Sequence, residues 1–253
     1  MIQSELVWEN PKQNRLQFSQ QIDAIKEPID LIILPEMFTT GFTMNPEKIA
    51  ETMTGKTVQW LIQNAKEKNV AITGSLIIKE AGNYYNRLLF VFPNGTIETY
   101  DKKHTFTLAG EDQVFTAGKN KLIVAYKGWK ICPLICYDLR FPVWARNTKN
   151  YHLLIYVANW PKPRIKAWEA LLKARAIENM SYCIGVNRVG TDANNLNYTG
   201  NSLAFDSLGA QISTLKPNTI QTEIIILNKE DLLQNRKQLQ FLNDKDSFKF
   251  LDC

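Results

Sequence analysis

The chain has 253 residues, of which 45% are hydrophobic, and this is enough for one large domain with a full core. Its net charge of +5 comes from basic and acidic residues that alternate along the sequence, which argues against a nucleic-acid partner. The apolar runs are only as long as a strand and the first residues lack a signal-peptide pattern, so we expect a cytoplasmic protein without a membrane partner.

The first half of the chain alternates between helical and strand patterns. A short strand within residues 2–7 precedes a predicted helix at 11–26, which an Asn-Pro pair opens with a cap and a first-turn proline. Residues 29–35 form a continuous apolar run typical of a buried strand, and this run ends at Glu36. A second amphipathic helix is predicted at 57–68.

The middle of the chain is rich in strands. Its turn signals are a Pro-Asn-Gly sequence and a Lys-Gly pair. The predicted strands are 70–78, 84–92, 96–100, 122–126 and 129–135.

In the last third of the chain, predicted strands and helices alternate again. The predicted strands are 151–158, 182–189, 202–206, 210–215 and 220–227. A helix at 165–180 separates the first two, and a final helix begins near residue 228. The predicted inner face of the helix at 165–180 consists of Ile165, Trp168, Leu172, Ile177 and Met180. This interleaving predicts one mixed α/β domain with helices on the outer faces of the sheets.

Residues 131–142 (ICPLICYDLRFP) are read as a strand, a sharp turn and a short helix through 143–148, with Pro142 suited to a first helical position. A thiol at such a turn lies next to amides that lower its pKa and can bind an oxyanion. Cys136 is therefore our candidate nucleophile. The alternative is an inert packing cysteine, because cysteine is among the most buried residue types.

A cysteine nucleophile needs a neighbouring base or cation. Glu36 ends a buried strand, where desolvation raises a carboxyl pKa toward a useful range, although such a Glu can also face water. Lys103 could stabilise a thiolate and an oxyanion, or be a plain surface charge. His104 and His152 have no supporting Cys-His signature.

The cysteines give no reason to expect a metal or a disulfide scaffold. They show no C-x-x-C pair, and the chain has only two histidines, so we expect reduced thiols and no zinc site. A redox pair of Cys132 with Cys136 is disfavoured, because Pro133 and the strand lie between the two thiols. The four cysteines are Cys132, Cys136, Cys183 and Cys253.

Three ordered segments resemble the signatures of the nitrilase, or carbon-nitrogen hydrolase, superfamily. They are residues 34–38 (LPEMF), 101–104 (DKKH) and 134–142 (LICYDLRFP), and residues 168–179 resemble the long helix of that family. The resemblance covers nearly the whole chain and implies an α-β-β-α sandwich over 1–253, with a C-terminal tail from about 228. The chain departs from the family at its start. Family members usually have a longer first strand before this position, whereas only two residues precede Gln3 here.

The resemblance implies a Glu-Lys-Cys triad, which we assign to Glu36, Lys103 and Cys136. The backbone N–H of Tyr137 would join the lysine at the oxyanion, and Glu111 would be a second carboxylate. A surface position is the alternative for Glu111. The resemblance also implies a homodimer or a larger homo-oligomer, and chemistry that needs no metal or organic cofactor.

Residues 39–42 (TTGF), 109–111 (AGE) and 156–161 (YVANWP) are similar to the bacterial omega-amidase branch. That similarity implies hydrolysis of the terminal amide of small 2-oxo acids, such as 2-oxoglutaramate and 2-oxosuccinamate, through a Cys thioester. A nitrilase or another small-amide amidase is the alternative. A carboxylate substrate suits a bidentate Arg, and the candidate pocket residues are Phe42, Arg140, Trp160 and Arg164, with Arg188 as a further arginine.

Overall fold

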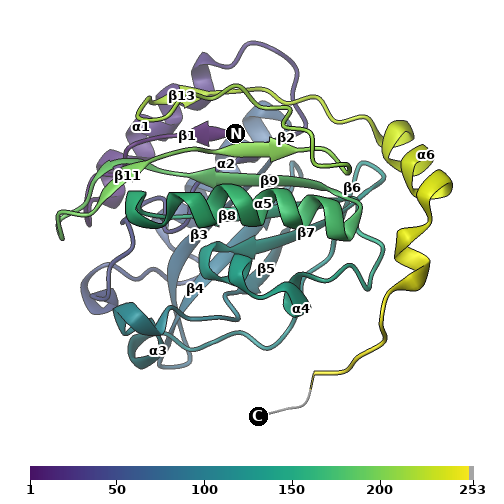
Figure 1. Cartoon of the computed structure of the whole chain (residues 1–253). Helices are drawn as coiled ribbons and strands as arrows, with labels where there is room; N and C mark the ends of the chain where they lie inside the picture. The colour runs from purple at the N-terminus through teal and green to yellow at the C-terminus, as the bar shows by residue number, and fades with distance from the viewer. Residues whose placement is uncertain (251–253) are drawn as a thin grey trace.

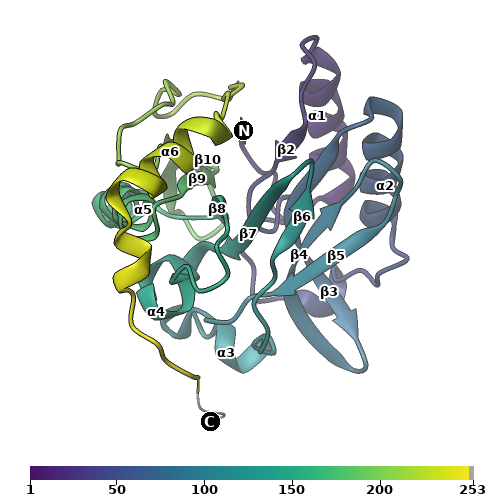
Figure 2. The ribbon, with the colours of Figure 1, turned by 90° about the vertical axis from the view of Figure 1, so that its right-hand side faces the viewer.

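Two β-sheets lie against each other between two layers of helices in the computed structural model, which describes residues 1–250 (Figure 1, Figure 2). The predicted α-β-β-α sandwich is thus confirmed. Cys253, the fourth cysteine, lies outside the described residues, as does the end of the predicted tail.

The first sheet has the strand order β2-β3-β4-β5. Its strands are β2 (Leu31–Ile33), β3 (Ala71–Glu80), β4 (Asn83–Val91) and β5 (Ile97–Asp101). β2 is parallel to β3, and the other two pairs are antiparallel hairpins. The Pro-Asn-Gly turn joins β4 to β5 as predicted, with Gly95 at φ +86°.

The second sheet has the order β12-β9-β8-β7-β6. Its strands are β6 (Val124–Tyr126), β7 (Trp129–Ile135), β8 (Leu153–Ala158), β9 (Tyr182–Asn187) and β12 (Leu203–Phe205). β7, β8 and β9 are parallel, so their carboxyl ends meet at one edge. Two small pairs complete the strands, formed by β1 (Ile2–Gln3) with β13 (Gln221–Thr222) and by β10 (Val189–Thr191) with β11 (Asn197–Thr199).

The helices cover the outer faces of the two sheets. α1 (Pro11–Ala24) and α2 (Lys56–Lys68) cover the first sheet, and α5 (Ile165–Asn179) covers the second (Figure 2). The shorter helices are α3 (Glu111–Val114), α4 (Pro142–Ala145) and α6 (Lys229–Leu239). The short 3₁₀ helices are η1 (Pro46–Lys48), η2 (Thr107–Ala109), η3 (Cys136–Arg140), η4 (Lys162–Arg164) and η5 (Phe241–Asp244).

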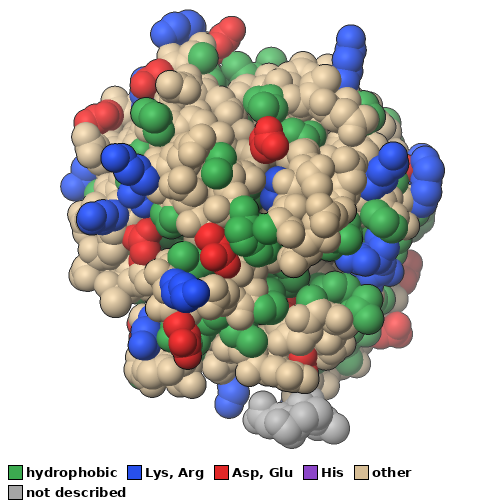
Figure 3. Space-filling model, turned by 90° about the vertical axis from the view of Figure 1, so that its left-hand side faces the viewer, with side chains coloured by type: hydrophobic (Ala, Val, Ile, Leu, Met, Phe, Trp, Pro, Cys, Tyr) green, Lys and Arg blue, Asp and Glu red, His purple; other side chains and the backbone are tan. Residues whose placement is uncertain are grey.

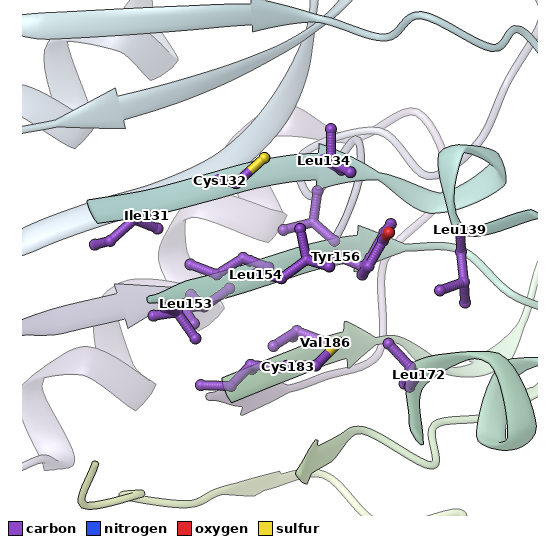
Figure 4. Packing of buried hydrophobic residues seen from close by; sticks show 14 of the residues in the cluster. Ile131, Cys132, Leu134, Leu139, Leu153, Leu154, Tyr156, Leu172, Cys183 and Val186 are labelled. Atoms are coloured by element: carbon purple, nitrogen blue, oxygen red, sulfur yellow. The ribbon is translucent and has the colours of Figure 1, made fainter. Parts of the chain in front are cut away.

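Apolar side chains fill the spaces between these layers. The largest cluster joins residues of both sheets, such as Phe90 and Leu134, and continues under α5 to Trp168 and Leu172. Figure 4 shows its centre on β7, β8 and β9. A second cluster lies under α1 and α2. Since β7 and β8 are buried on both faces, they read as continuous apolar runs in the sequence.

Several predicted elements differ from the structure. In place of the predicted strand at 210–215, the structure has one isolated β-bridge, between Phe205 and Gln211. Of the predicted strand at 220–227, only the two residues of β13 are in a strand. The reason is that β13 can pair only with the two residues of β1. The helix predicted at 143–148 ends at Ala145.

The face of α5 also differs from the prediction at one position. Ile177 is 45% exposed, whereas Arg175, Ala176 and Asn179 are buried. The buried face of α5 continues from Leu172 to these three residues, and Ile177 lies outside that face.

Charges of both signs are interspersed on the face drawn in Figure 3. None of the helices within residues 1–250 is both long enough and apolar enough to cross a membrane.

Candidate active site

Cys136 lies where β7 ends and η3 begins. Its φ is +43°, a left-handed conformation that is costly for a residue with a side chain and persists only when its surroundings hold it. The residue is 9% exposed, and its Sγ lies 4.0 Å from the backbone oxygen of Asn159. Tyr137 follows in η3, where the first N–H groups of a helix have no partner within the helix.

Glu36 comes shortly after β2, and its side chain is fully buried. Its Oε1 accepts hydrogen bonds from Asn86 Nδ2 at 2.8 Å and Lys102 Nζ at 2.9 Å. Its Oε2 accepts one from the Asn159 N–H at 2.8 Å. These donors offset the cost of burying the carboxylate and fix its orientation. Glu36 therefore does not face water, which was the alternative.

The structure corrects our choice of lysine, because Lys102 and not Lys103 extends into the site. Lys102 Nζ lies 2.9 Å from Glu36 Oε1 and 2.9 Å from Glu111 Oε2. Lys103 Nζ instead lies 5.7 Å from the ring centre of Trp144. The Lys102 N–H still pairs with the Asn86 carbonyl beyond the end of β5. Neighbouring side chains of an extended strand point to opposite faces, so only one of two adjacent lysines reaches the site.

Glu111 begins α3 and belongs to the same buried cluster. Its two oxygens lie 3.1 Å and 2.9 Å from Lys102 Nζ. It also accepts hydrogen bonds from Asn86 Nδ2 at 3.2 Å and from the Phe106 N–H at 2.5 Å. The structure thus contradicts the surface position considered as the alternative for Glu111.

The electrostatics of the cluster favour a neutral thiol and a charged ammonium. Burial raises the pKa of the Cys136 thiol well above its usual range, and the charge of Glu36 adds to this, while Lys102 opposes it. Burial by itself would lower the pKa of Lys102, but Glu111 and Glu36 outweigh it and raise that pKa. Our expectation of a lowered thiol pKa is therefore wrong, since desolvation and the charge of Glu36 together exceed the opposing effect of Lys102.

The pKa of Glu111 is raised by burial and by the charge of Glu36, while Lys102 acts in the opposite direction. The two carboxylates thus share one ammonium and one amide donor, Asn86 Nδ2.

Lys102, Cys136 and Tyr137 line a cavity of about 520 Å³. The side chains predicted for a pocket all line it as well, namely Phe42, Arg140, Trp160 and Arg164. The Arg140 guanidinium lies 4.9 Å from the ring centre of Trp160, and that of Arg164 lies 5.1 Å from the ring centre of Phe106.

Arg188, the further arginine considered for the pocket, does not line the cavity. It is fully buried, and its guanidinium donates to the backbone oxygens of Val189 and Leu6. The remaining wall includes residues that sequence reasoning did not single out, among them Trp8, Glu9, Asp192 and Tyr198.

Two amide side chains of the site were also missed. Asn86, on β4, donates to both carboxylates, and Asn159 donates through its backbone and its side chain to Glu36. Nothing in the local sequence marks Asn86, because its role depends on β4 lying beside β5. Asn159 stands in the YVANWP segment, which was recognised by its resemblance alone.

Within residues 1–250, no three His, Cys, Asp or Glu side chains are grouped so that they could hold a metal ion. The chemistry available is that of a cysteine beside a carboxylate and an ammonium, which suits attack on a carbonyl or nitrile carbon followed by hydrolysis.

The comparisons with known proteins agree with this class of site. The carbon-nitrogen hydrolase family matches residues 1–234. The chain is 42% identical to omega-amidase YafV of Yersinia enterocolitica, over 99% of this chain and 97% of the relative. It is 33% identical to 2-oxoglutaramate amidase of Bacillus subtilis (strain 168), over 82% of each chain.

A solved structure of the same family is also similar to this chain. XC1258 from Xanthomonas campestris, described as a CN-hydrolase superfamily protein with an arsenic adduct in the active site, has a TM-score of 0.96 and 38% identity, with 99% of this chain and 97% of that one covered. The chain therefore belongs to the carbon-nitrogen hydrolase family.

Proposed function

We propose that the protein is an omega-amidase, which hydrolyses the terminal amide of 2-oxoglutaramate or 2-oxosuccinamate to the 2-oxo diacid and ammonia. The observation that carries this proposal is one cavity that joins the buried Cys136, Glu36 and Lys102 cluster to two arginines, Arg140 and Arg164. The names of the relatives in Yersinia enterocolitica and Bacillus subtilis support the same substrate class.

Acylation begins from a neutral thiol, in keeping with its raised pKa. As the Cys136 sulfur attacks the amide carbon, Glu36 accepts the thiol proton. The oxyanion of the tetrahedral intermediate is bound by the Lys102 ammonium and the Tyr137 N–H. Glu36 then transfers the proton to the amide nitrogen, the carbon–nitrogen bond breaks, and ammonia leaves a thioester on Cys136.

Deacylation uses the same groups in the reverse roles. Glu36 takes a proton from water, and the resulting hydroxide attacks the thioester carbon. Collapse of the second tetrahedral intermediate breaks the carbon–sulfur bond, and Glu36 returns its proton to the Cys136 sulfur. Glu111 accepts hydrogen bonds from Lys102 Nζ with both oxygens and holds the ammonium in place.

The substrate carboxylate distinguishes a 2-oxo acid amide from a simple amide. Arg140 and Arg164 line the cavity and supply guanidinium groups that can bind it in a bidentate manner. The aromatic rings beside them, Trp160 and Phe106, limit the directions in which each guanidinium can point.

The test is ammonia release from 2-oxoglutaramate and 2-oxosuccinamate by wild type and by Cys136→Ala, beside glutamine, asparagine and a simple nitrile. We expect turnover of the oxo amides that disappears in the variant. Turnover of the nitrile or of other amides alone would replace the substrate class and keep the nucleophile. The same ammonia release from both proteins would refute the hydrolase proposal.

The expected homodimer or larger homo-oligomer and the cytoplasmic location stay predictions. Light scattering coupled to size-exclusion chromatography tests the first, and cell fractionation tests the second.

A further inference from the structure

A buried carboxylate behind the catalytic cluster joins the segment that carries Lys102 to the turn that carries Cys136. Asp138 belongs to η3 and is fully buried. Its Oδ2 accepts a hydrogen bond at 3.0 Å from the N–H of Ile135, the residue directly before Cys136. This contact holds the turn in which Cys136 has its left-handed conformation.

The same carboxylate also holds the chain on both sides of Lys102. Asp138 Oδ2 accepts a hydrogen bond from the Tyr100 hydroxyl at 2.8 Å. Its Oδ1 accepts one from the His104 N–H at 3.0 Å and lies 2.7 Å from His104 Nδ1. Because a carboxylate only accepts, Nδ1 must carry a proton in this contact.

The outer members of this cluster are fixed as well. The His104 ring stacks on Phe141 with ring centres 3.7 Å apart and planes at 4°. The Tyr100 hydroxyl accepts hydrogen bonds from Trp144 Nε1 at 3.0 Å and from the Lys103 N–H at 3.2 Å. Burial and the charge of Asp138 raise the pKa of Tyr100, so the phenol keeps the proton that it donates.

Asp138, His104 and Tyr100 do not line the 520 Å³ cavity, so they have no contact with a substrate bound there. They connect two elements of different sheets, β5 and the turn after β7, at the point where each presents a reacting group. We propose that Asp138 and His104 are positioning residues, which set the distance between the Lys102 ammonium and the Cys136 sulfur. This inference rests on the function proposed above.

His104 allows the sharper test, because two substitutions separate its hydrogen bond from its ring. His104→Phe keeps a ring to stack on Phe141 and removes the Nδ1 donor. His104→Asn removes the ring and keeps a donor near the place of Nδ1. The only other histidine, His152, lies at the opposite end of β8 from the site, so His152→Phe is the matched control.

Two rates would be measured at about pH 8 for each variant. The first is steady-state turnover of 2-oxoglutaramate. The second is alkylation of Cys136 by iodoacetamide, followed by mass spectrometry of its peptide with Cys136→Ala as the background. Alkylation requires a thiolate, which a nearby Lys102 ammonium favours, and it needs no substrate.

For His104→Phe we expect kcat to fall by about tenfold to a hundredfold, since small misplacements of reacting groups have effects of this size. We expect KM to change by less than about twofold, because no substrate contact is lost. The alkylation rate should fall with kcat, His104→Asn should recover most of both rates, and His152→Phe should match wild type.

Unchanged kcat and alkylation in His104→Phe would overturn the proposal. So would equal losses in His104→Phe and His104→Asn together with a lowered melting temperature, because the imidazole would then only fill space. If wild type fails to hydrolyse the oxo amide while the alkylation rates follow the expected order, the proposed function fails and the positioning role stands.

Discussion

Adjacent residues of the same type can have unrelated roles, and Lys102 and Lys103 are such a pair. Composition and spacing gave no means to choose between them, since both follow β5. The structure separates them by burial, because Lys102 is 1% exposed and lies between two carboxylates. The direction of one side chain thus decides which ammonium can reach an oxyanion beside Cys136.

We predict that Lys102→Met lowers kcat for 2-oxoglutaramate by about a hundred- to a thousandfold, which is the effect of losing one oxyanion donor. Lys103→Met is the matched control and should stay within about threefold of wild type, because the Lys103 ammonium lies over the Trp144 ring and not in the carboxylate cluster. Steady-state kinetics of both variants provide the measurement. A larger loss in the Lys103 variant would restore our original assignment.

The same substitution has a consequence for stability. Without Lys102, Glu36 and Glu111 are buried like charges with Asn86 as their shared donor. Loss of one partner of a buried ion pair costs about 3–5 kcal/mol. Circular dichroism should therefore confirm that Lys102→Met is folded at the assay temperature before its kcat is interpreted.

The arginines of the cavity give a second prediction. Charged hydrogen bonds contribute about 1.5–3 kcal/mol, so Arg140→Ala or Arg164→Ala should lower kcat/KM for 2-oxoglutaramate by about tenfold to a hundredfold if that residue binds the carboxylate. The control substrate is butyramide, which has the amide and lacks the carboxylate. Equal losses for both substrates in both variants would refute carboxylate recognition by these arginines.

The site residues differ in how far the sequence could identify them. Cys136 and Glu36 each follow an apolar strand, and this local pattern was sufficient to place them at the end of a buried strand. Asn86 lies in the middle of a β-rich run, and its side chain becomes functional only because β4 pairs with β5. Pairing partners are a long-range property, which periodicity does not contain.

At the level of elements, the strongly patterned segments were predicted well. α2 begins one residue before its predicted start, and the strands that became β3, β4, β7 and β8 were placed within a few residues. The failures lie where an element depends on a partner. Residues 224–227 form a continuous apolar run that favours a strand, but Ile224 and Ile226 are exposed because no long neighbouring strand is present.

The packing of α5 on β9 depends on a glycine. A Cβ at Gly185 would lie 2.4 Å from Leu172 Cδ1 and 2.6 Å from Trp168 Cζ2. We predict that Gly185→Ala destabilises the fold by about 1–3 kcal/mol, because the extra methyl group forces α5 away from the sheet. Denaturant unfolding measures the difference.

A double-mutant cycle tests whether this contact is the cause. Leu172→Ala alone leaves a cavity and should cost about 2–5 kcal/mol. In the double variant the new methyl group occupies part of that cavity, so the combined loss should be smaller than the sum of the two. An additive result would show that the strain at Gly185 arises elsewhere.

The site exists only when the two sheets are stacked. Glu36, Asn86 and Lys102 come from the first sheet or its ends, whereas Cys136 and Asn159 follow strands of the second. The two sheets lie side by side in Figure 2, and the cluster that joins them extends to Cys136. Loss of the contact between the sheets therefore separates the base from the nucleophile and should abolish activity together with the tertiary fold.

His152, at the end of the second sheet away from the site, is expected to make the stability of the fold depend on pH. His152 Nδ1 accepts a hydrogen bond from the Lys130 N–H at 3.0 Å. Burial, with the charges of Arg236, Lys229 and Lys130, lowers the pKa of His152 from 6.5 to about 4. Between these values the unfolded chain binds a proton that the folded chain does not, so this residue reduces stability as the pH falls and has no effect above the window.

His152→Asn isolates this contribution, because asparagine does not titrate and keeps an oxygen acceptor near the place of Nδ1. We predict that the melting temperature of the variant, relative to wild type, rises as the pH is lowered from about 7.5 to about 5. The side chain is partly exposed and solvent screens its charge, so the rise should be modest. Differential scanning calorimetry at both pH values measures it. A difference between the two proteins that does not change with pH would show that His152 has its ordinary pKa in the folded protein.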